Sequence, residues 1–147
     1  MNRDFVEMLS ALCEEGAEFL LVGAYALAVH GQPRATGDLD LWVRPEAHNA
    51  RRVLAALRRF GAPSEGIGEA DLAHSDMVFQ IGVQPVRIDI LTSIDSVGFE
   101  EAWTERITAE LAGLTIPVIG RAHLIRNKRA TGRTRDLADA EALEGGH

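Results

Sequence analysis

Two aspartates stand one residue apart in an otherwise apolar stretch of this sequence. Asp38 and Asp40 belong to the segment DLDLWVR, and the apolar run over Asp38–Arg44 predicts a β-strand. Residues i and i+2 of a strand point to the same face, so the two carboxylates are expected to project side by side. Like charges that are partly buried repel unless a cation lies between them, and Mg²⁺ prefers such oxygen ligands. The pair is therefore a candidate magnesium site, unless Asp38 merely begins the strand and Asp40 faces solvent.

A third acid lies in another apolar run. The segment VRIDIL, Val86–Leu91, reads as a strand, and it carries Asp89 in its middle. A lone carboxylate has no evident role in the core, where burying its charge is costly. If this strand lies beside Asp38–Arg44, Asp89 completes an acidic cluster with the first two aspartates.

A glycine turn supplies a candidate phosphate site. Gly23 follows the apolar strand Phe19–Val22 and precedes a helical segment, Ala24–His30. Glycine lets a phosphate approach the backbone, and the start of a helix offers free N–H groups and a positive dipole end. Arg34 and Lys128 are candidates to neutralise phosphate charge, the first as a planar fork and the second as a point charge.

Elements that would position these residues follow from hydrophobic periodicity and turn residues. Helices are predicted at Asp4–Gly16, Ala24–His30, Glu46–Phe60, Phe99–Ile107, Ala122–Ala130 and Arg135–Leu143; strands at Phe19–Val22, Asp38–Arg44, Met77–Ile81, Val86–Leu91 and Leu114–Ile119; turns or loops at Gly31–Gly37, Gly61–Gly68 and Gly82–Pro85. This order predicts one α/β (α+β) domain over residues 1–147, with a small mixed sheet flanked by helices. A helical pair, broken at Gly132, is expected at about 121–145.

Composition excludes several classes of protein. The net charge of −7 argues against a general nucleic-acid-coating protein, which needs a broad basic face. The single Cys13 excludes an internal disulfide, and no cysteine–histidine spacing indicates zinc. The N-terminal segment is amphipathic and contains acids, so we expect neither a signal peptide nor a membrane partner. The cytoplasm is the expected location.

The combination of these motifs resembles a known family. Gly23-Ala24, a thirteen-residue spacer, Asp38-Leu39-Asp40 and a later strand bearing Asp89 resemble the signature of the polymerase β-like nucleotidyltransferase superfamily. The segments HGQPRATGDLDLWV and NKRATGRTRDLADAEAL resemble more closely a small prokaryotic branch, the minimal nucleotidyltransferases related to AbiEii-type toxins. The resemblance spans roughly residues 18–143, and it implies the polymerase β-like fold.

What the resemblance implies chemically is Mg²⁺-dependent transfer of an NMP from an NTP to an acceptor hydroxyl. Asp38 and Asp40 would bind two Mg²⁺ ions, and Asp89 would bind the ion at the acceptor and accept the acceptor's proton. The nucleotide-binding residues implied are Gly23, Ala24, Arg34, Thr36 and Lys128. The acceptor is left open between RNA, a protein and a small molecule, with a role in toxin–antitoxin or phage-defence systems, a cognate toxin or antitoxin partner, or a homodimer.

One departure from the family pattern supports an alternative. Many active members have Gly-Ser where this chain has Gly23-Ala24, so a phosphate-binding hydroxyl is missing. The alternative is a catalytically weak or inactive module of the same fold that binds a nucleotide or a partner. A third reading is an unrelated α/β protein whose acids are structural. Convergence of the three carboxylates distinguishes this third reading from the other two.

The basic residues near the C-terminus give a further hypothesis. We expect Arg126, Lys128, Arg129 and Arg133 to line one rim of the cleft. Arg133, Arg135 and Asp136 are explained equally well by an internal salt bridge at the start of a helix.

Overall fold

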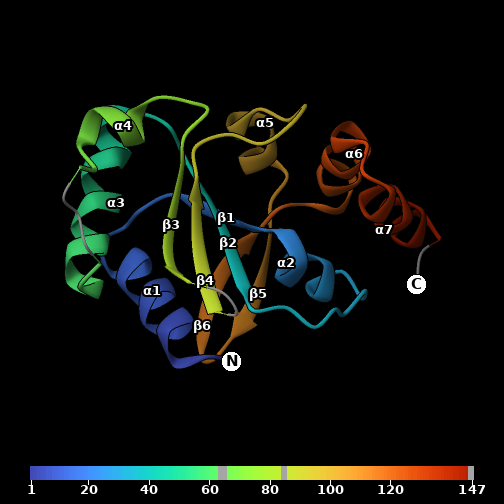
Figure 1. The fold of residues 1–147 in the computed structure, drawn as a ribbon, viewed down its shortest axis with the longest axis horizontal. Helices are drawn as coiled ribbons and strands as arrows, with labels where there is room; N and C mark the ends of the chain where they lie inside the picture. Colours follow the sequence, from blue (N-terminus) through green and yellow to red (C-terminus); the bar gives the residue numbers. More distant parts are fainter. Residues whose placement is uncertain (63–65, 84–85, 146–147) are drawn as a thin grey trace.

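The computed structural model describes residues 1–62, 66–83 and 86–145 (Figure 1). Its elements in chain order are α1 (Arg3–Glu14), β1 (Phe19–Val22), α2 (Gly23–Val29), β2 (Asp38–Val43), α3 (Ala47–Phe60), α4 (Glu69–Ala73), β3 (Val78–Val83), β4 (Val86–Leu91), α5 (Phe99–Thr104), β5 (Ile107–Leu111), β6 (Leu114–Val118), α6 (Arg121–Thr131) and α7 (Thr134–Glu144).

The described strands form one mixed six-stranded sheet in the order β3-β4-β2-β1-β6-β5. Strand β2 runs parallel to β4, and β1 runs parallel to β6, whereas the other neighbours are antiparallel. Helices α1, α3 and α4 lie on one side of the sheet and α2, α6 and α7 on the other (Figure 1). The prediction of a small mixed sheet flanked by helices is confirmed.

Alternation along β2 separates the core from the site. Leu39, Leu41 and Val43 are fully buried, whereas Asp38 and Asp40 point to the opposite face and stay partly exposed. This is the period-2 pattern of a strand whose two faces have different surroundings. Trp42 continues the face of the aspartates, but it is buried against Phe99 of α5, with ring centroids 5.0 Å apart. The polar face of β2 therefore ends at Asp40.

One predicted helix is partly wrong. The helix expected over Phe99–Ile107 ends at Thr104, and Ile107 instead begins β5, a strand absent from the prediction. Strand β5 forms a hairpin with β6 through Ala112 and Gly113, whose φ values of 51° and 81° are those of a type I′ turn. Because β5 is a sheet edge with mostly exposed residues, it lacks the apolar signal of a buried strand.

Two smaller differences concern the region before β4. Helix α4 is not predicted, because five residues are too few to show helical periodicity. Strand β3 ends at Val83, whereas Ile81 is its expected end, so Gly82 and Val83 belong to the strand rather than to a turn. The rest of the predicted turn, residues 84–85, and residues 63–65 of the predicted loop lie outside the described residues.

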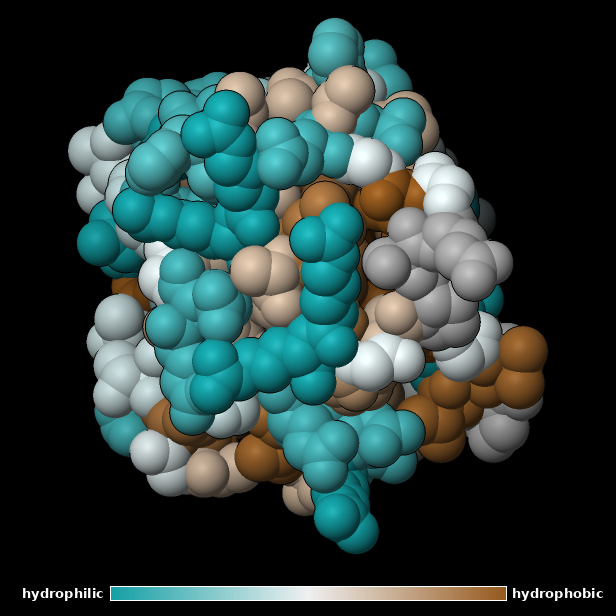
Figure 2. Space-filling model, turned by 90° about the vertical axis from the view of Figure 1, so that its left-hand side faces the viewer, coloured by the Kyte–Doolittle hydropathy of each residue, from teal (hydrophilic) through white to brown (hydrophobic). Residues whose placement is uncertain are grey.

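Polar side chains cover the outward-facing surface of α3 and α4. Figure 2 shows the face that carries α3 and α4, where hydrophilic residues dominate. Arg51, Arg52, Arg58 and Arg59 are exposed on α3, whereas its Val53 side packs into the core. Among the described residues, no helix has the length and apolar character needed to cross a bilayer.

Candidate active site

Adjacent parallel strands bring the three predicted acids together. Asp40 of β2 is the register partner of Asp89 of β4, and Asp38 is the partner of Arg87. Paired residues of neighbouring strands point to the same face, so all three carboxylates share one surface of the sheet. Asp89 is only 7% exposed. A shared face is what a nucleotidyltransferase-like site requires, and the strand register supplies it.

A fourth residue of this face, Arg87, lies among the carboxylates. Its Nε donates to Oδ1 of Asp89 at 2.8 Å, and its Nη2 donates to Oδ2 of Asp89 at 3.1 Å. The same Nη2 lies 3.5 Å from Oδ2 of Asp38. These contacts raise the pKa of Arg87, chiefly through the hydrogen bond to Asp89. Sequence reasoning missed Arg87, although its position two residues before Asp89 places both side chains on one face.

The surroundings of Asp40 raise the pKa of its carboxyl group. Burial, followed by the negative charges of Asp89 and Asp38 and a hydrogen bond with Asp89, raises the pKa of Asp40 to about 7, although Arg87 opposes the change. Near neutral pH, Asp40 is therefore partly protonated unless a cation lies close to it. This excess of negative charge is the physical condition that favours metal binding.

Gly23 packs directly against Asp40. Its φ is +69°, and a Cβ added there would lie 2.1 Å from Oδ2 of Asp40, far inside van der Waals contact. The contact follows from strand pairing, because Val22, the residue before Gly23, is the antiparallel partner of Asp40. Val22, the N-cap residue of α2, makes no side-chain cap hydrogen bond, and the first amides of a helix, here those of Gly23 and Ala24, have no partner within the helix.

A cleft of about 520 Å³ opens over this face of the sheet. An adjoining cavity of about 280 Å³ extends toward the start of α2. The eight predicted site residues all line one or both of these spaces: Gly23, Ala24, Arg34, Thr36, Asp38, Asp40, Asp89 and Lys128. The structure thus brings the predicted acids and the predicted phosphate-binding residues to one continuous opening.

Arg34 and Lys128 meet at a carboxylate that sequence reasoning missed. Asp139 accepts hydrogen bonds from both terminal nitrogens of Arg34, with Nη1 at 2.9 Å from Oδ2. The Nζ of Lys128 lies 3.3 Å from the same oxygen of Asp139. Asp139 is 6% exposed, so this ion pair is largely withdrawn from water. The signal in the sequence is the i, i+3 spacing of Asp136 and Asp139, which places both acids on one side of a helix.

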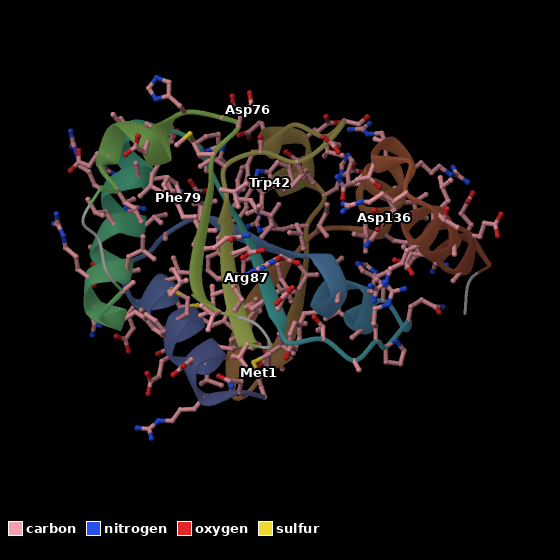
Figure 3. The ribbon with its side chains drawn as sticks, viewed as in Figure 1. Met1, Trp42, Asp76, Phe79, Arg87 and Asp136 are labelled. Carbon is pink, nitrogen blue, oxygen red and sulfur yellow. The ribbon has the colours of Figure 1, made fainter. Side chains whose placement is uncertain are left out.

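Asp136 anchors the other end of this ionic network. It accepts hydrogen bonds from Nζ of Lys128 at 3.1 Å, from the hydroxyl of Thr131 at 2.6 Å and from Nε of Arg133 at 2.9 Å. Burial raises the pKa of Asp136, but the bonds from Thr131 and Lys128 and the nearby positive charges outweigh it, so the pKa is lowered overall. Figure 3 shows Asp136 on the C-terminal helices and Arg87 on the sheet, both of which line the cleft.

The expected basic rim is only partly correct. Lys128 and Arg133 line the cleft. Arg126 instead pairs with Glu101, and Arg129 pairs with Glu144, and neither is among the described residues that line the two spaces. On α6, residues 126 and 129 point away from the face that presents Lys128, because a helix turns about 100° per residue.

Thr36 has a local structural role. Its hydroxyl oxygen accepts the backbone N–H of Asp38 at 3.0 Å. This serine/threonine-type turn sets the direction in which the chain enters β2. The backbone N–H of Arg87 also donates to the carbonyl of Gly37 at 2.9 Å, which fixes β4 to the same turn.

The donor set fits Mg²⁺ in kind. Three carboxylates on one face supply the hard oxygen ligands that this ion prefers, and the raised pKa of Asp40 shows an unmet need for positive charge. Across the described parts of the chain, however, no three acidic, histidine or cysteine side chains are grouped so as to hold an ion as they stand. The guanidinium of Arg87 lies between Asp38 and Asp89 and uses oxygens that an ion would need.

Comparison with known proteins gives structural likeness without sequence likeness. No protein-family model and no curated protein matches the chain. The lincosamide antibiotic adenylyltransferase LnuA, solved with lincomycin bound, is similar with a TM-score of 0.62 and 13% identity, over 100% of this chain and 98% of its own. The antibiotic-resistance factor ANT(2'')-Ia is similar with a TM-score of 0.62 and 14% identity, over 95% of this chain and 80% of its own.

A further solved structure is also similar to this chain. An antigenic nucleotidyltransferase-like protein from Paracoccidioides brasiliensis is similar with a TM-score of 0.53 and 16% identity, over 95% of this chain and 74% of its own. Sequence identities this low show the fold and not the activity. The order of elements, the mixed sheet and these neighbours together show that the chain has the same fold as these nucleotidyltransferase structures.

Proposed function

We propose that this protein is a Mg²⁺-dependent nucleotidyltransferase that moves an NMP from an NTP to an acceptor hydroxyl. The observation that carries the proposal is the register of β2 and β4, which joins Asp38, Asp40 and Asp89 on one face with Gly23 packed against Asp40. Acids alone occur on many folds. Acids beside an uncapped helix start and a cleft bordered by Lys128 and Arg34 suit a metal-bound triphosphate.

The proposed reaction assigns a role to each group. The acceptor oxygen bonds to the α-phosphorus, the bond from that phosphorus to the bridging oxygen breaks, and pyrophosphate leaves. Two Mg²⁺ ions, when bound, stabilise the charges on the attacking and leaving oxygens. Asp38 and Asp40 hold these ions, and Asp89 takes the proton of the acceptor hydroxyl.

The phosphate side of the site uses backbone and basic groups. The amides of Gly23 and Ala24 donate to the β- and γ-phosphates, and Arg34 and Lys128 balance their charge. Asp139 keeps these two cations in place before the nucleotide arrives, so little side-chain ordering remains to be done on binding. Thr36 holds the turn that carries Asp38.

We infer a small hydroxylated molecule as the first acceptor class to test. LnuA and ANT(2'')-Ia are antibiotic-modifying or resistance proteins of similar size and fold. RNA and protein acceptors remain the other two classes, together with a toxin–antitoxin or phage-defence role that involves a partner chain or a second copy. A reaction that consumes an NTP is placed in the cytoplasm, where NTPs are made.

Calorimetry tests the proposal. Each of the four NTPs is titrated, with and without Mg²⁺, into the wild type, the double variant Asp38→Asn/Asp40→Asn, and Asp95→Asn, a control acid that lines the same cleft outside the trio. We expect Mg²⁺-dependent binding of at least one NTP, lost in the double variant and kept in the control. Transfer of label from α-labelled NTP to candidate acceptors then identifies the acceptor.

The opposite result favours the alternative function. Ala24 in place of serine and the occupation of Asp89 by Arg87 are the observations that suit a module without turnover. Binding of an NTP without transfer to any acceptor class would support that module. No binding of any NTP by the wild type would overturn the nucleotidyltransferase proposal.

A further inference from the structure

The guanidinium of Arg87 occupies the centre of the carboxylate cluster. It forms a two-pronged pair with Asp89, through Nε at 2.8 Å and Nη2 at 3.1 Å, and Nη2 reaches Oδ2 of Asp38 at 3.5 Å. Both oxygens of Asp89 and one oxygen of Asp38 thus face a positive charge already. A planar guanidinium matches carboxylates in this geometry better than any other side chain.

Strand register brings these three side chains together on one face of the sheet. Arg87 lies directly across the parallel pair from Asp38 and two residues before Asp89, so the three side chains rise from the same face. Among them, the side chain of Arg87 is 23% exposed and that of Asp89 is 10% exposed. The pair is therefore largely shielded from water and is stronger than a surface ion pair.

We propose that Arg87 takes the place of the divalent cation while no nucleotide is bound, and that it moves to the nucleotide's phosphates when Mg²⁺ and NTP enter together. This inference rests on the proposed function. It assigns to Arg87 two partners in turn, the acids and then the triphosphate, and so makes it the residue that couples metal binding to nucleotide binding.

Charge explains why Arg87 must move. A divalent ion and a guanidinium that share the carboxylate of Asp89 repel each other at such a short distance. Once released, a partly buried guanidinium needs another anion, because leaving it unpaired is costly. In the proposed function the triphosphate would enter the same cleft that Arg87 lines, where it would offer the guanidinium a new anionic partner.

The neighbouring strand leaves room for that movement. On the β3 side, the register partner of Arg87 is Gly82, which has no side chain to confine it. Gly82 has a φ of +88°, and a Cβ built there would lie 3.0 Å from the carbonyl oxygen of Val86. The backbone thus favours glycine next to Arg87, and no side chain at this paired position of β3 limits the movement of the guanidinium.

The proposal predicts effects of opposite sign from one substitution. Arg87→Gln removes the competitor for the acids, so Mn²⁺, used as a probe for the metal alone, is expected to bind about ten- to a hundred-fold more tightly. The same change removes a phosphate partner, so the metal–NTP complex is expected to bind about ten-fold more weakly. A residue that only supports the fold would weaken both.

Two further variants separate charge from geometry. Arg87→Lys keeps the positive charge but loses the planar fork, so Mn²⁺ affinity stays within about three-fold of the wild type while NTP affinity falls. Arg133→Gln removes a charge from the same cleft, where Arg133 pairs with Asp136 rather than with the trio, and it is expected to change Mn²⁺ affinity by less than about three-fold.

The experiment measures free Mn²⁺ by electron paramagnetic resonance without nucleotide, and NTP binding by calorimetry with Mg²⁺, on the full chain and these variants. Thermal unfolding monitored by circular dichroism verifies that each variant is folded. If Arg87→Gln does not fold, the measurements on Arg87→Lys test the proposal instead. Tighter Mn²⁺ with weaker NTP supports the proposal. If Mn²⁺ and NTP both bind Arg87→Gln more weakly than the wild type, or both bind it with unchanged affinity, while the wild type binds NTP, the inference about Arg87 is overturned. The proposed function then still stands. A wild type that binds no NTP overturns both.

Discussion

Asp40 is enclosed by neighbours that leave it little freedom. Gly23 packs on one side, Asp89 lies across the strand pair, and Asp38 lies two residues earlier on the same face. A candidate metal ligand has to be held in position, and this close packing restricts Asp40. Two predictions follow at the scale of single residues.

Replacing Gly23 is expected to abolish the nucleotide site. In Gly23→Ala the new Cβ would lie 2.1 Å from Oδ2 of Asp40. The alanine would also have to adopt the left-handed φ of Gly23, which alone costs about 1–2 kcal/mol. Gly61→Ala is the matched control, since Gly61 has a φ of +89° with nothing within 4 Å of an added Cβ. Both variants should melt earlier, but only Gly23→Ala should lose Mg²⁺-dependent NTP binding by calorimetry. Wild-type binding by Gly23→Ala would contradict the close contact.

The raised pKa of Asp40 predicts an unusual dependence of stability on pH. Because its folded pKa of about 7 exceeds the ordinary value of 3.8, the folded state holds a proton that the unfolded state releases. The free energy of unfolding therefore falls as pH rises from about 4 to about 7, by up to about 4 kcal/mol from this group.

Asp40→Asn isolates that contribution. In urea unfolding with EDTA present, the variant should gain stability over the wild type as pH rises from 4 to 7, with no further gain above pH 7.5. The difference between the two proteins cancels the titration of groups that do not interact with Asp40. A difference that does not change with pH would show that Asp40 titrates normally.

At the scale of elements, α6 and α7 depend on the site they border. Lys128 of α6 and Arg34, which precedes β2, both pair with Asp139 of α7, which is buried. Asp139→Asn takes a carboxylate partner from two partly buried cations, and the loss is expected to cost up to about 3–5 kcal/mol, the range for breaking a buried pair. Glu144→Gln, which breaks an exposed pair with Arg129, is the control and should cost under about 1 kcal/mol.

Hydrogen exchange shows which elements lose stability in this variant. In Asp139→Asn, faster exchange is expected across residues 121–145 and in the turn that carries Arg34, whereas β2 and β4 keep their protection. Uniformly faster exchange over the whole sheet would instead mean that Asp139 supports global folding rather than the docking of the C-terminal pair.

The elements that the sequence predicts well are those with a strong apolar period. Strands β1, β2, β4 and β6 and helices α1, α3, α6 and α7 lie close to their expected places. Strand β5 was beyond prediction because an exposed edge strand has no buried face. Arg87 and Asp139 escaped notice for another reason, since an ion pair between segments depends on register and helix docking, which periodicity does not specify.

At the scale of the whole molecule, the net charge of −7 limits the acceptor. A polyanion gains little from a surface with this excess of acids, since nucleic-acid affinity comes largely from neutralised phosphates. Fluorescence anisotropy with a generic single-stranded RNA should show no binding at micromolar protein and physiological salt. Binding that weakens steeply with added salt would instead point to an RNA acceptor.

The parallel pairing of β1 with β6 affects the order in which the chain folds during synthesis. Leu21 is among the first core residues made, yet its partner Val118 emerges after most of the domain. Pairings this distant in sequence are slow to form, because the loop must close before contacts repay it. The acids of β2 and β4 meet earlier, whereas Lys128 and Asp139 arrive last. In the proposed function, a ribosome-bound chain would therefore bring its three acids together before Lys128 joins the cleft, and it would become competent for substrate only when α6 and α7 dock.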